Sequence, residues 1–277
     1  MALFGVEYLH SRFSREPDGP AVPGGIPSAT RAAGQGTPLG SGRDEASTGA
    51  AVRTMFGEVA PRYDFLNHFL SLGRDIAWRR AAAHALKDIL ARPGSRVADV
   101  CCGTGDLSFS LGRQSQGVVL GADFCHPMLA IARSKAGKHG RRIHFLEADT
   151  LRLPFGDASL DAVTSAFGFR NLANYNRGIE EMRRVLKSGG RLAILEFSRV
   201  RWPIFGPLFR FYFRRVLPRI GAWISGVEGP YSYLPDSVEK FPDQDVLAEM
   251  LRAAGFHKVS YRNFTGGVAA LHVGERT

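Results

Sequence analysis

The sequence predicts an α/β fold built on a mostly parallel, seven-stranded sheet with helices on both faces. Three observations support this prediction. Short, nearly continuous apolar runs alternate with longer stretches in which apolar residues recur at helical spacing, as in repeated strand–helix units. The first run delivers an acid, Asp99, into a glycine turn that ends at Gly105. The last two runs are joined by Thr265–Gly267, which predicts a closing hairpin.

The predicted elements follow one another from residue 96 onward. The first two strands begin at Arg96 and Val118, and the others cover 143–148, 160–167, 191–197, 258–264 and 268–273. Helices are predicted over 127–138 and 175–186, because apolar residues there recur at helical spacing. The second helix ends in Lys187-Ser-Gly-Gly190, a basic last turn with a glycine stop.

The chain of 277 residues divides into one domain and a tail. Residues 1–50 are rich in Gly, Pro, Ala, Ser and Thr without apolar periodicity, which predicts a disordered N-terminal extension. Its four Arg and five acidic residues give only weak support for a transit peptide. Residues 51–277 are long enough to bury the core of one catalytic domain.

The number of cysteines and the hydropathy of the chain indicate where in the cell the protein is located. The three cysteines, two of them adjacent, show neither a disulfide framework nor metal-ligand spacing, so we expect no metal and a reducing cytoplasm. No apolar run reaches the roughly 20 residues that span a bilayer. The matrix of an organelle is the alternative location if residues 1–50 are a transit peptide.

The net charge of +10 is most concentrated in residues 197–223, which hold six Arg, eight aromatic residues and no acid. Three interpretations of this Arg-aromatic segment stay open. It can lie at a membrane surface with its guanidinium groups near anionic headgroups. It can instead cap the sheet with its aromatic side chains in the core, or stack on single-stranded RNA. We expect peripheral contact with the inner face of the membrane and no nucleic-acid partner.

The glycine turn indicates the chemistry of its ligand. Ser108 stands where a dinucleotide fingerprint has its third glycine, after Gly103 and Gly105. Asp106 puts negative charge where a pyrophosphate would sit. A cationic nucleoside without phosphate suits this turn better, and S-adenosylmethionine is such a molecule. The alternative is a buried strand followed by an ordinary glycine turn.

Each group of this ligand has a candidate partner. The methionine carboxylate is expected to accept hydrogen bonds from the backbone between Gly103 and Gly105. The ammonium is expected to pair with Asp99. Asp123, which ends the second predicted strand, is expected to bind the ribose hydroxyls.

Further motifs stand in order between residues 51 and 277. They are Met55–Asn67, Ser71–Gly73 with Trp78, Cys102–Leu107, Leu153–Phe155, Phe167–Leu172, Arg184–Leu192 with Leu195–Ser198, Val216–Gly221, Phe241–Asp245 and Thr265–His272. Many methyltransferases share the glycine loop, whereas Phe167–Leu172 and Val216–Gly221 are much narrower. Over these residues the chain resembles the UbiE/MenG family of quinone-biosynthesis C-methyltransferases.

The resemblance implies a Rossmann-like class I methyltransferase with a helical cover from the N-terminal part and from residues 197–245. It implies methyl transfer from S-adenosylmethionine to a ring carbon of a polyprenylated quinol. Demethylmenaquinol is the favoured acceptor, and a 2-methoxy-6-polyprenyl-1,4-benzoquinol of ubiquinone biosynthesis is the alternative. A methyltransferase acting on RNA or on another small molecule is a more distant alternative. A homodimer is compatible with the resemblance.

The resemblance also implies cofactor contacts at particular residues. They fall on Thr104, Asp123, Asp149 and Thr150 of this sequence. A further contact, often Ser in the family, falls on Ala166. This departure removes one hydroxyl group from the expected site.

Candidates for the acceptor side follow the fourth predicted strand. Arg170 and Asn171 stand at the carboxyl edge, where open α/β sheets bind ligands. The Arg170 guanidinium is expected to stabilise the quinol oxyanion, whose charge makes the ring carbon nucleophilic. A salt bridge to an acid of a cover helix is the alternative. Tyr63, on the N-terminal cover, is expected either to position the ring or to pack.

Two more titratable residues lie near strand ends. Glu196 ends the fifth predicted strand and, as a buried acid, needs a partner, for which an Arg is expected. His272 titrates in the range of a general base, although a structural role is favoured. The extension is expected to be dispensable, so deletion of residues 1–50 should leave activity in vitro largely intact.

Overall fold

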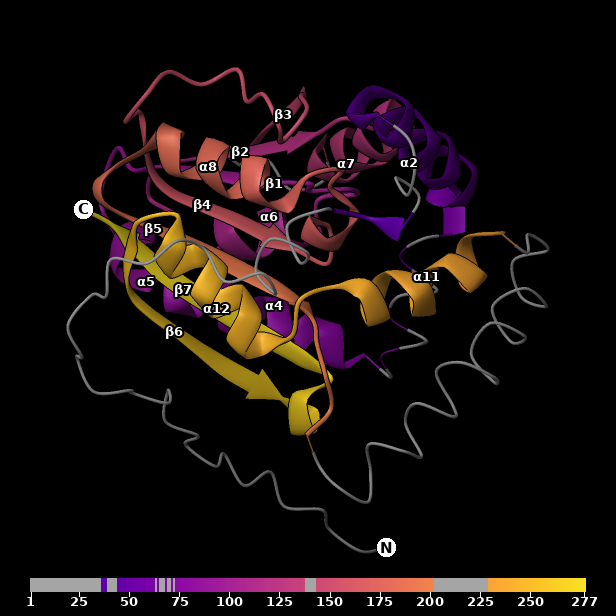
Figure 1. Ribbon diagram of the computed structural model, residues 1–277. Coiled ribbons are helices and arrows are strands. Elements are labelled where there is room, and N and C mark those ends of the chain that lie inside the picture. Colours follow the sequence, from indigo (N-terminus) through magenta and orange to yellow (C-terminus); the bar gives the residue numbers. More distant parts are fainter. Residues whose placement is uncertain are drawn as a thin grey trace, which may run out of the picture.

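The computed structural model describes residues 36–38, 44–62, 64, 68, 71, 73–137, 143–201 and 229–277. It contains a seven-stranded sheet (Figure 1) with the strand order β3-β2-β1-β4-β5-β7-β6. The strands are β1 (Arg96–Val100), β2 (Val118–Asp123), β3 (Ile143–Glu147), β4 (Leu160–Ala166), β5 (Leu186–Phe197), β6 (Phe256–Phe264) and β7 (Ala269–Arg276). β1 to β5 pair in parallel, and β7 is antiparallel to β5 and β6. The predicted mostly parallel sheet and its closing hairpin are confirmed.

Helices cover both faces of the sheet, so its central strands are apolar on both sides. α4 (Arg74–Ala85), α5 (Lys87–Leu90) and α6 (Asp106–Gly112) lie on one face, and α8 (Tyr175–Val185) and α12 (Gln244–Ala253) lie on the other (Figure 1). α7 (His126–Gly137) packs beside β2 and β3. Each face has its own apolar core, with Leu86 and Leu107 in one and Ile179 and Leu247 in the other.

The strand order creates a crevice at the centre of the sheet. β1 is followed in sequence by its neighbour β2, whereas β4, its neighbour on the other side, leads on to β5. The chain therefore leaves β1 and β4 in opposite directions, and open α/β sheets bind ligands at the carboxyl ends of such strands. The glycine turn follows β1, and Phe167–Leu172 follows β4. The topology thus brings the two most informative motifs together.

The helical cover of this edge begins earlier in the chain than composition suggests. α2 (Glu45–Val59), continued by η2 (Ala60–Arg62), and α11 (Gly229–Lys240) lie beyond the carboxyl ends of the parallel strands (Figure 1). Asp44 caps α2 by accepting a hydrogen bond from the backbone N of Ser47 at 2.8 Å. The boundary expected between residues 50 and 51 falls inside α2. The small residues of its first turns lack apolar periodicity, so the sequence pattern does not predict a helix there.

A second part of the expected extension also packs on the domain. Residues 36–38, here called the N-terminal strap, lie against the segment after β4, where Thr37 N donates to Leu172 O at 2.8 Å. Gly36 has a φ of +90°, and a Cβ there would lie 2.0 Å from Ala173 O. Only glycine fits this position. Residues 1–35 and 39–43 lie outside the described residues.

Two expectations about membranes meet different outcomes. None of the described helices combines the length and the apolar character needed to cross a bilayer. Most of the Arg-aromatic segment, residues 202–223, lies outside the described residues. Its contact with a membrane therefore stays a prediction.

The contacts of Thr37 and the start of α2 at Glu45 contradict the expectation that residues 1–50 are dispensable. Deletion of residues 1–50 is instead expected to destabilise the protein, unlike deletion of residues 1–35. The longer deletion removes the N-terminal strap together with the N-cap and first turn of α2, and loss of an N-cap alone costs about 0.5–2 kcal/mol. We expect the free energy of unfolding, measured by urea titration, to be at least ~1 kcal/mol lower for the longer deletion. Equal urea midpoints would show that the strap and this turn add no stability.

Candidate active site

A cavity opens at the carboxyl ends of β1, β2 and β4, and its space, including the part open to solvent, is about 690 Å³. It lies where the strand order predicts a ligand site. Its lining consists of Glu45, Gly49 and Phe56 of α2, Cys101, Gly103, Asp123–Cys125, Met128, Asp149–Leu151, Phe167, Gly168 and Asn171–Ala173.

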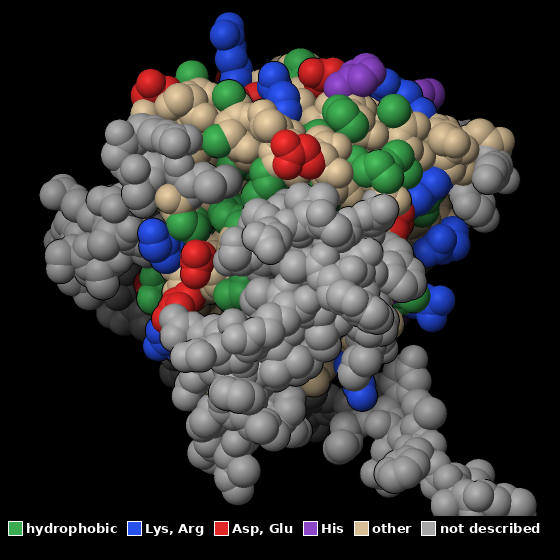
Figure 2. Space-filling view, turned by 90° about the vertical axis from the view of Figure 1, so that its right-hand side faces the viewer, with side chains coloured by type: hydrophobic (Ala, Val, Ile, Leu, Met, Phe, Trp, Pro, Cys, Tyr) green, Lys and Arg blue, Asp and Glu red, His purple; other side chains and the backbone are tan. Residues whose placement is uncertain are grey.

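The cavity is acidic although the chain is basic. Glu45, Asp123 and Asp149 contribute carboxylates, of which that of Glu45 is paired with Arg177 at 2.5 Å, and the described part of the lining contains no Lys or Arg. Figure 2 shows the side of the molecule on which α2 and α11 lie, with described hydrophobic side chains gathered in the upper middle and several Lys and Arg side chains towards the edges. Carboxylates attract cations and repel phosphates. The cavity therefore suits a cationic ligand better than a pyrophosphate.

Two strained turns meet at the cavity. Cys101 and Phe167 have positive φ angles, +53° and +59°, although neither is glycine. Such conformations cost of order 1–3 kcal/mol and persist only where the surroundings hold them. A Cβ on Gly168 would lie 2.4 Å from the Cβ of Cys101. The missing side chain at Gly168 thus allows the turns after β1 and β4 to touch.

The backbone of the glycine turn already has partners within the protein. Gly103 N donates to Oδ2 of Asp123 at 2.8 Å, and Gly105 N donates to Cys102 O at 2.9 Å. Each backbone N–H offers one proton, so the expected bonds from Gly103 and Gly105 to a methionine carboxylate are not supported. A Cβ on Gly105 would lie 2.8 Å from the Phe145 ring. Gly105 instead permits close packing of the turn on β3.

Asp123 occupies the position expected of a ribose ligand. It ends β2, lines the cavity and is 6% exposed. One carboxylate oxygen accepts from Gly103 N and the other from Cys125 N, each at 2.8 Å. A carboxylate has about four lone-pair positions, so acceptor capacity is left for two hydroxyl groups. Burial raises the pKa of Asp123 to about 6, although the backbone hydrogen bonds oppose this shift.

Asp99 does not reach the cavity, contrary to its expected pairing with an ammonium group. It is 0% exposed, and its carboxylate accepts hydrogen bonds from Ser108 Oγ at 2.6 Å and Thr164 Oγ1 at 3.2 Å. Burial raises the pKa of Asp99 to about 7. Asp99 therefore joins β1 to α6 and β4 beneath the glycine turn. The hydroxyl of Ser108, at the position of a third glycine, makes this link.

Asp149 and Thr150 line the cavity as expected. Asp149 Oδ1 accepts from Leu151 N at 2.9 Å, which fixes the direction of the carboxylate. Thr150 Oγ1 lies 3.3 Å from Cys101 Sγ. Burial raises the pKa of the Cys101 thiol, so this side chain is neutral and takes no nucleophilic role.

The structure does not bring Thr104 and Ala166 to the cavity surface. Thr104 is buried, and its hydroxyl donates to the carboxylate of Asp64. Ala166 ends β4 opposite Leu195 of β5. The side chain of Thr104 thus links the glycine turn to Asp64 of the N-terminal cover. Ala166 is part of the sheet.

Arg170 is buried in an ion pair and is not part of the cavity lining. Its Nη1 lies 2.9 Å from Oε1 of Glu196 and also donates to Phe167 O. Its Nε donates to Ser237 Oγ of α11 at 3.4 Å. The guanidinium lies over the Phe197 ring. The Arg partner expected for Glu196 is therefore confirmed, and direct contact of Arg170 with a quinol oxyanion is not supported by this geometry.

Asn171 is the candidate acceptor-side residue that does line the cavity. It ends the short helix η3 (Phe169–Asn171), and its Oδ1 accepts a hydrogen bond from the Tyr233 hydroxyl at 2.8 Å. Tyr63 lies outside the described residues, so its expected role stays a prediction.

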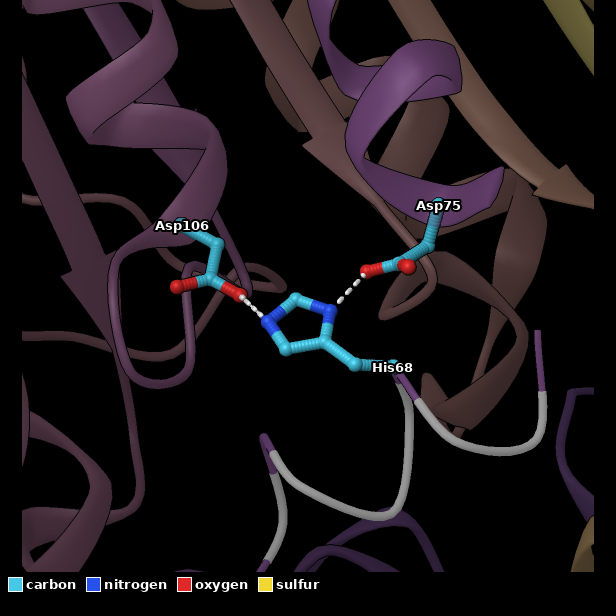
Figure 3. A group of neighbouring side chains, drawn as sticks. All are labelled: His68, Asp75 and Asp106. Atoms are coloured by element: carbon cyan, nitrogen blue, oxygen red, sulfur yellow. Dashed lines mark hydrogen bonds and ion pairs between the residues drawn. The ribbon is translucent and has the colours of Figure 1, made fainter. Parts of the chain in front are cut away.

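A charged network beside the glycine turn has no counterpart among the sequence-based expectations. The His68 imidazole lies between the carboxylates of Asp75 on α4 and Asp106 on α6 (Figure 3), with Nδ1 2.7 Å from Asp75 and Nε2 3.8 Å from Asp106. Arg79 contacts Asp75, and Lys135 Nζ lies 3.0 Å from Asp106. Lys135 Nζ also lies 2.5 Å from Asp64. Because the acids of this group already have Arg79 and Lys135 as partners, it suits an internal charge network better than a metal ion.

His272 has the structural role favoured by the sequence. It is buried, and its Nε2 lies 2.9 Å from Gln244 O. Burial lowers the pKa of His272 to about 4. It does not belong to the cavity lining, so it is not placed to act as a general base there.

The fold is shared with known methyltransferases. A crystal structure of an S-adenosylmethionine-dependent methyltransferase from Aquifex aeolicus matches with a TM-score of 0.52 and 21% identity, covering 71% of this chain and 89% of that one. A structure from Thermotoga maritima, described as a possible histamine N-methyltransferase, matches with a TM-score of 0.53 and 16% identity, covering 80% of this chain and 100% of that one. These similarities establish the fold.

Sequence relatives are much closer. The demethylmenaquinone methyltransferase of Deinococcus radiodurans is 51% identical over 240 residues, which cover 86% of this chain and 97% of that protein. The protein of the same name from Thermus thermophilus is 52% identical over 223 residues, covering 80% and 100%. A ubiquinone/menaquinone biosynthesis C-methyltransferase, UbiE, from a Geobacter species is 44% identical over 232 residues, covering 82% and 97%.

The family model agrees with the structural boundaries. The ubiE/COQ5 methyltransferase model matches residues 44–276, from the N-cap of α2 to the end of β7. The match thus includes the cavity and both helices of its described cover. The chain belongs to the ubiE/COQ5 methyltransferase family and is an S-adenosylmethionine-dependent methyltransferase.

Proposed function

We propose that the protein transfers the methyl group of S-adenosylmethionine to a ring carbon of demethylmenaquinol. The observation that carries this proposal is the cavity between the turns after β1 and β4, which has acidic groups beside an apolar wall. The relatives from Deinococcus radiodurans and Thermus thermophilus, both named demethylmenaquinone methyltransferase, support this choice of acceptor.

The acidic groups of the cavity suit the methyl donor. S-adenosylmethionine carries a positive sulfonium and no phosphate, so carboxylates favour its binding over that of a dinucleotide. Asp123 would accept hydrogen bonds from the ribose hydroxyls, and Asp149 with Thr150 would face the remaining polar groups of the nucleoside. Gly103 would support cofactor binding indirectly, because its N–H donates to the Asp123 carboxylate and holds it in place.

The apolar wall suits a quinol ring. Phe56, Phe124, Met128, Phe167 and Leu172 contribute to it. In the proposed reaction the ring carbon forms a bond to the methyl carbon while the methyl–sulfur bond breaks, and the ring carbon then loses a proton. Ionisation of the neighbouring hydroxyl raises the electron density on that carbon. Alignment of the two reacting carbons supplies much of the rate.

In this proposal Asn171, rather than Arg170, meets the charge that develops on the quinol oxygen. Asn171 belongs to the cavity lining, and an N–H donor aimed at a developing oxyanion lowers the barrier most where water is excluded. Arg170 is a positioning residue: it holds the turn that carries Asn171 through Glu196, Phe167 O and Ser237.

A benzoquinol acceptor is the second candidate, because the relative from a Geobacter species is named for both ubiquinone and menaquinone biosynthesis. We further propose that the Arg-aromatic segment of residues 197–223 meets the prenyl tail at the inner face of the membrane. Its six Arg and eight aromatic residues support this placement. Cofactor binding without a metal is part of the same proposal.

The acceptor can be identified with purified protein and chemically reduced quinones. We expect S-adenosylmethionine-dependent conversion of demethylmenaquinol to menaquinol, detected by mass spectrometry, at a kcat/KM at least tenfold above that for 2-methoxy-6-polyprenyl-1,4-benzoquinol, a difference of about 1.4 kcal/mol. Preference for the benzoquinol would reassign the acceptor. Methylation of RNA alone, with affinity that falls steeply with salt, would refute both quinol proposals.

Asp123→Asn is expected to weaken cofactor binding about 10- to 100-fold, because hydrogen bonds to a charged acceptor contribute about 1.5–3 kcal/mol. The carboxylate binds hydroxyls in its ionised form, and its pKa is about 6. Affinity of the wild type should therefore fall as pH decreases below 6, by at most about tenfold per pH unit. Calorimetric titration with S-adenosylhomocysteine measures both effects. A pH dependence that persists in Asp123→Asn would exclude Asp123 as its source.

Arg170→Ala is expected to reduce stability as well as turnover. Removal of Arg170 leaves the buried Glu196 carboxylate without its charged partner, which costs about 3–5 kcal/mol of unfolding free energy. Lys258→Ala, which breaks the exposed pair with Glu275, is the matched control and should cost about 0–1 kcal/mol. Urea titration compares the two variants. Equal stability of both would contradict the structural role of Arg170.

A further inference from the structure

The N-terminal strap reaches the candidate active site, although it lies before the residues that the family model matches. Thr37 is 3% exposed and is bonded through its backbone to Leu172, the residue after Asn171. Gly36 seats the strap, because a side chain there would collide with Ala173 O. Both contacts are to residues of the cavity lining. The strap is therefore part of the support of that wall.

Three side chains continue this contact as a chain of hydrogen bonds. Thr37 Oγ1 lies 2.5 Å from the Tyr233 hydroxyl, which donates to Asn171 Oδ1 at 2.8 Å. The phenol has one proton, and the amide oxygen can only accept. The direction of the chain is therefore from Thr37 to Tyr233 to Asn171. Burial raises the pKa of Tyr233, although the bond from Thr37 opposes this shift, so the phenol keeps its proton.

The chain determines which end of the Asn171 amide is available to a ligand. With Oδ1 occupied by Tyr233, the Nδ2 group is the remaining polar end, and it finds no acceptor among the described residues. The backbone of the same turn is held separately, since Tyr175 donates to Arg170 O at 2.9 Å and Glu196 accepts from Arg170 N at 3.2 Å. Tyr233 thus acts on the orientation of the amide, not on the position of the turn.

We propose that Thr37 and Tyr233 are positioning residues that hold the Asn171 amide with its N–H group directed at the acceptor oxygen. This inference rests on the proposed function, because the ligand of the amide is the quinol oxygen. It assigns a role in turnover to a segment outside the family match. An amide that is free to rotate would present its carbonyl oxygen part of the time and would repel the oxyanion.

Isosteric variants test the chain without leaving a cavity. Tyr233→Phe removes only a hydroxyl, and Thr37→Val replaces only a hydroxyl by a methyl group. We expect kcat for quinol methylation to fall about tenfold in Tyr233→Phe, equivalent to loss of one hydrogen bond of about 1.4 kcal/mol, and less in Thr37→Val. KM for S-adenosylmethionine should stay unchanged. Tyr261→Phe and Thr54→Val, whose hydroxyls bond elsewhere on the surface, are the matched controls and should keep the wild-type kcat.

A double-mutant cycle distinguishes a positioning role of Tyr233 from a role in packing alone. In an Asn171→Ala background, Tyr233→Phe should cause no further loss of kcat, because its effect acts through the amide. Full additivity of the two losses, or wild-type kcat in Tyr233→Phe, would overturn the proposal. Deletion of residues 1–43 should lower kcat as Thr37→Val does, whereas deletion of residues 1–35 should not.

A second measurement is independent of the substrate. The shift in urea midpoint of the Thr37→Val, Tyr233→Phe double variant should be smaller than the sum of the single shifts, because both remove the same bond. Additive shifts would overturn the chain itself. If the wild type methylates neither quinol, the proposed function fails, and this unfolding cycle still decides whether the chain exists.

Discussion

The buried ion pair between Arg170 and Glu196 supports the half of the site that receives the acceptor. Glu196 ends β5, and Arg170 lies in the turn after β4, so the pair ties two neighbouring strand ends together. The same guanidinium bonds Phe167 O and Ser237, which adds the strained turn and α11 to the assembly. A buried charge pair of this kind is costly to break on one side only. The turn that carries Asn171 is therefore held at several points, and a single further bond, from Tyr233, orients its amide.

On the methyl-donor side of the site, one buried acid lines the cavity and another makes only internal hydrogen bonds. Asp123 accepts hydrogen bonds from Gly103 N of the glycine turn and from Cys125 N after β2, and it also belongs to the cavity lining. Asp99, one strand away, uses its carboxylate entirely for structure. Burial raises the pKa of both acids, but only Asp123 is open to a ligand. Asp123 and Asp99 thus differ in their access to the cavity, and this access distinguishes the candidate binding residue from the structural one.

Charge distribution explains why total charge is a poor guide to this protein. The chain carries +10, but the described lining of the cavity is acidic. Basic residues near the site are used internally: Arg79 and Lys135 neutralise the acids around His68, and Arg170 neutralises Glu196. A basic composition thus coexists with a cavity for a cation. The proposed acceptor, a lipid quinol, requires apolar surface, which the aromatic side chains of the wall provide.

The sequence by itself determined the sheet, the place of the site and the family. Apolar runs and glycine turns have local causes, so the strands, and the positions of Asp123 and Asn171 at strand ends, could be predicted from spacing. Asp149 was indicated by the family resemblance instead. The tertiary structure alone decided that Asp99 is enclosed, that Gly103 and Gly105 have internal acceptors, and that Arg170 faces Glu196. It also decided that Thr37 meets Tyr233, a residue 196 positions away. Local patterns predict which backbone a segment adopts, but the direction of a side chain and the partner it finds depend on residues that only folding brings near.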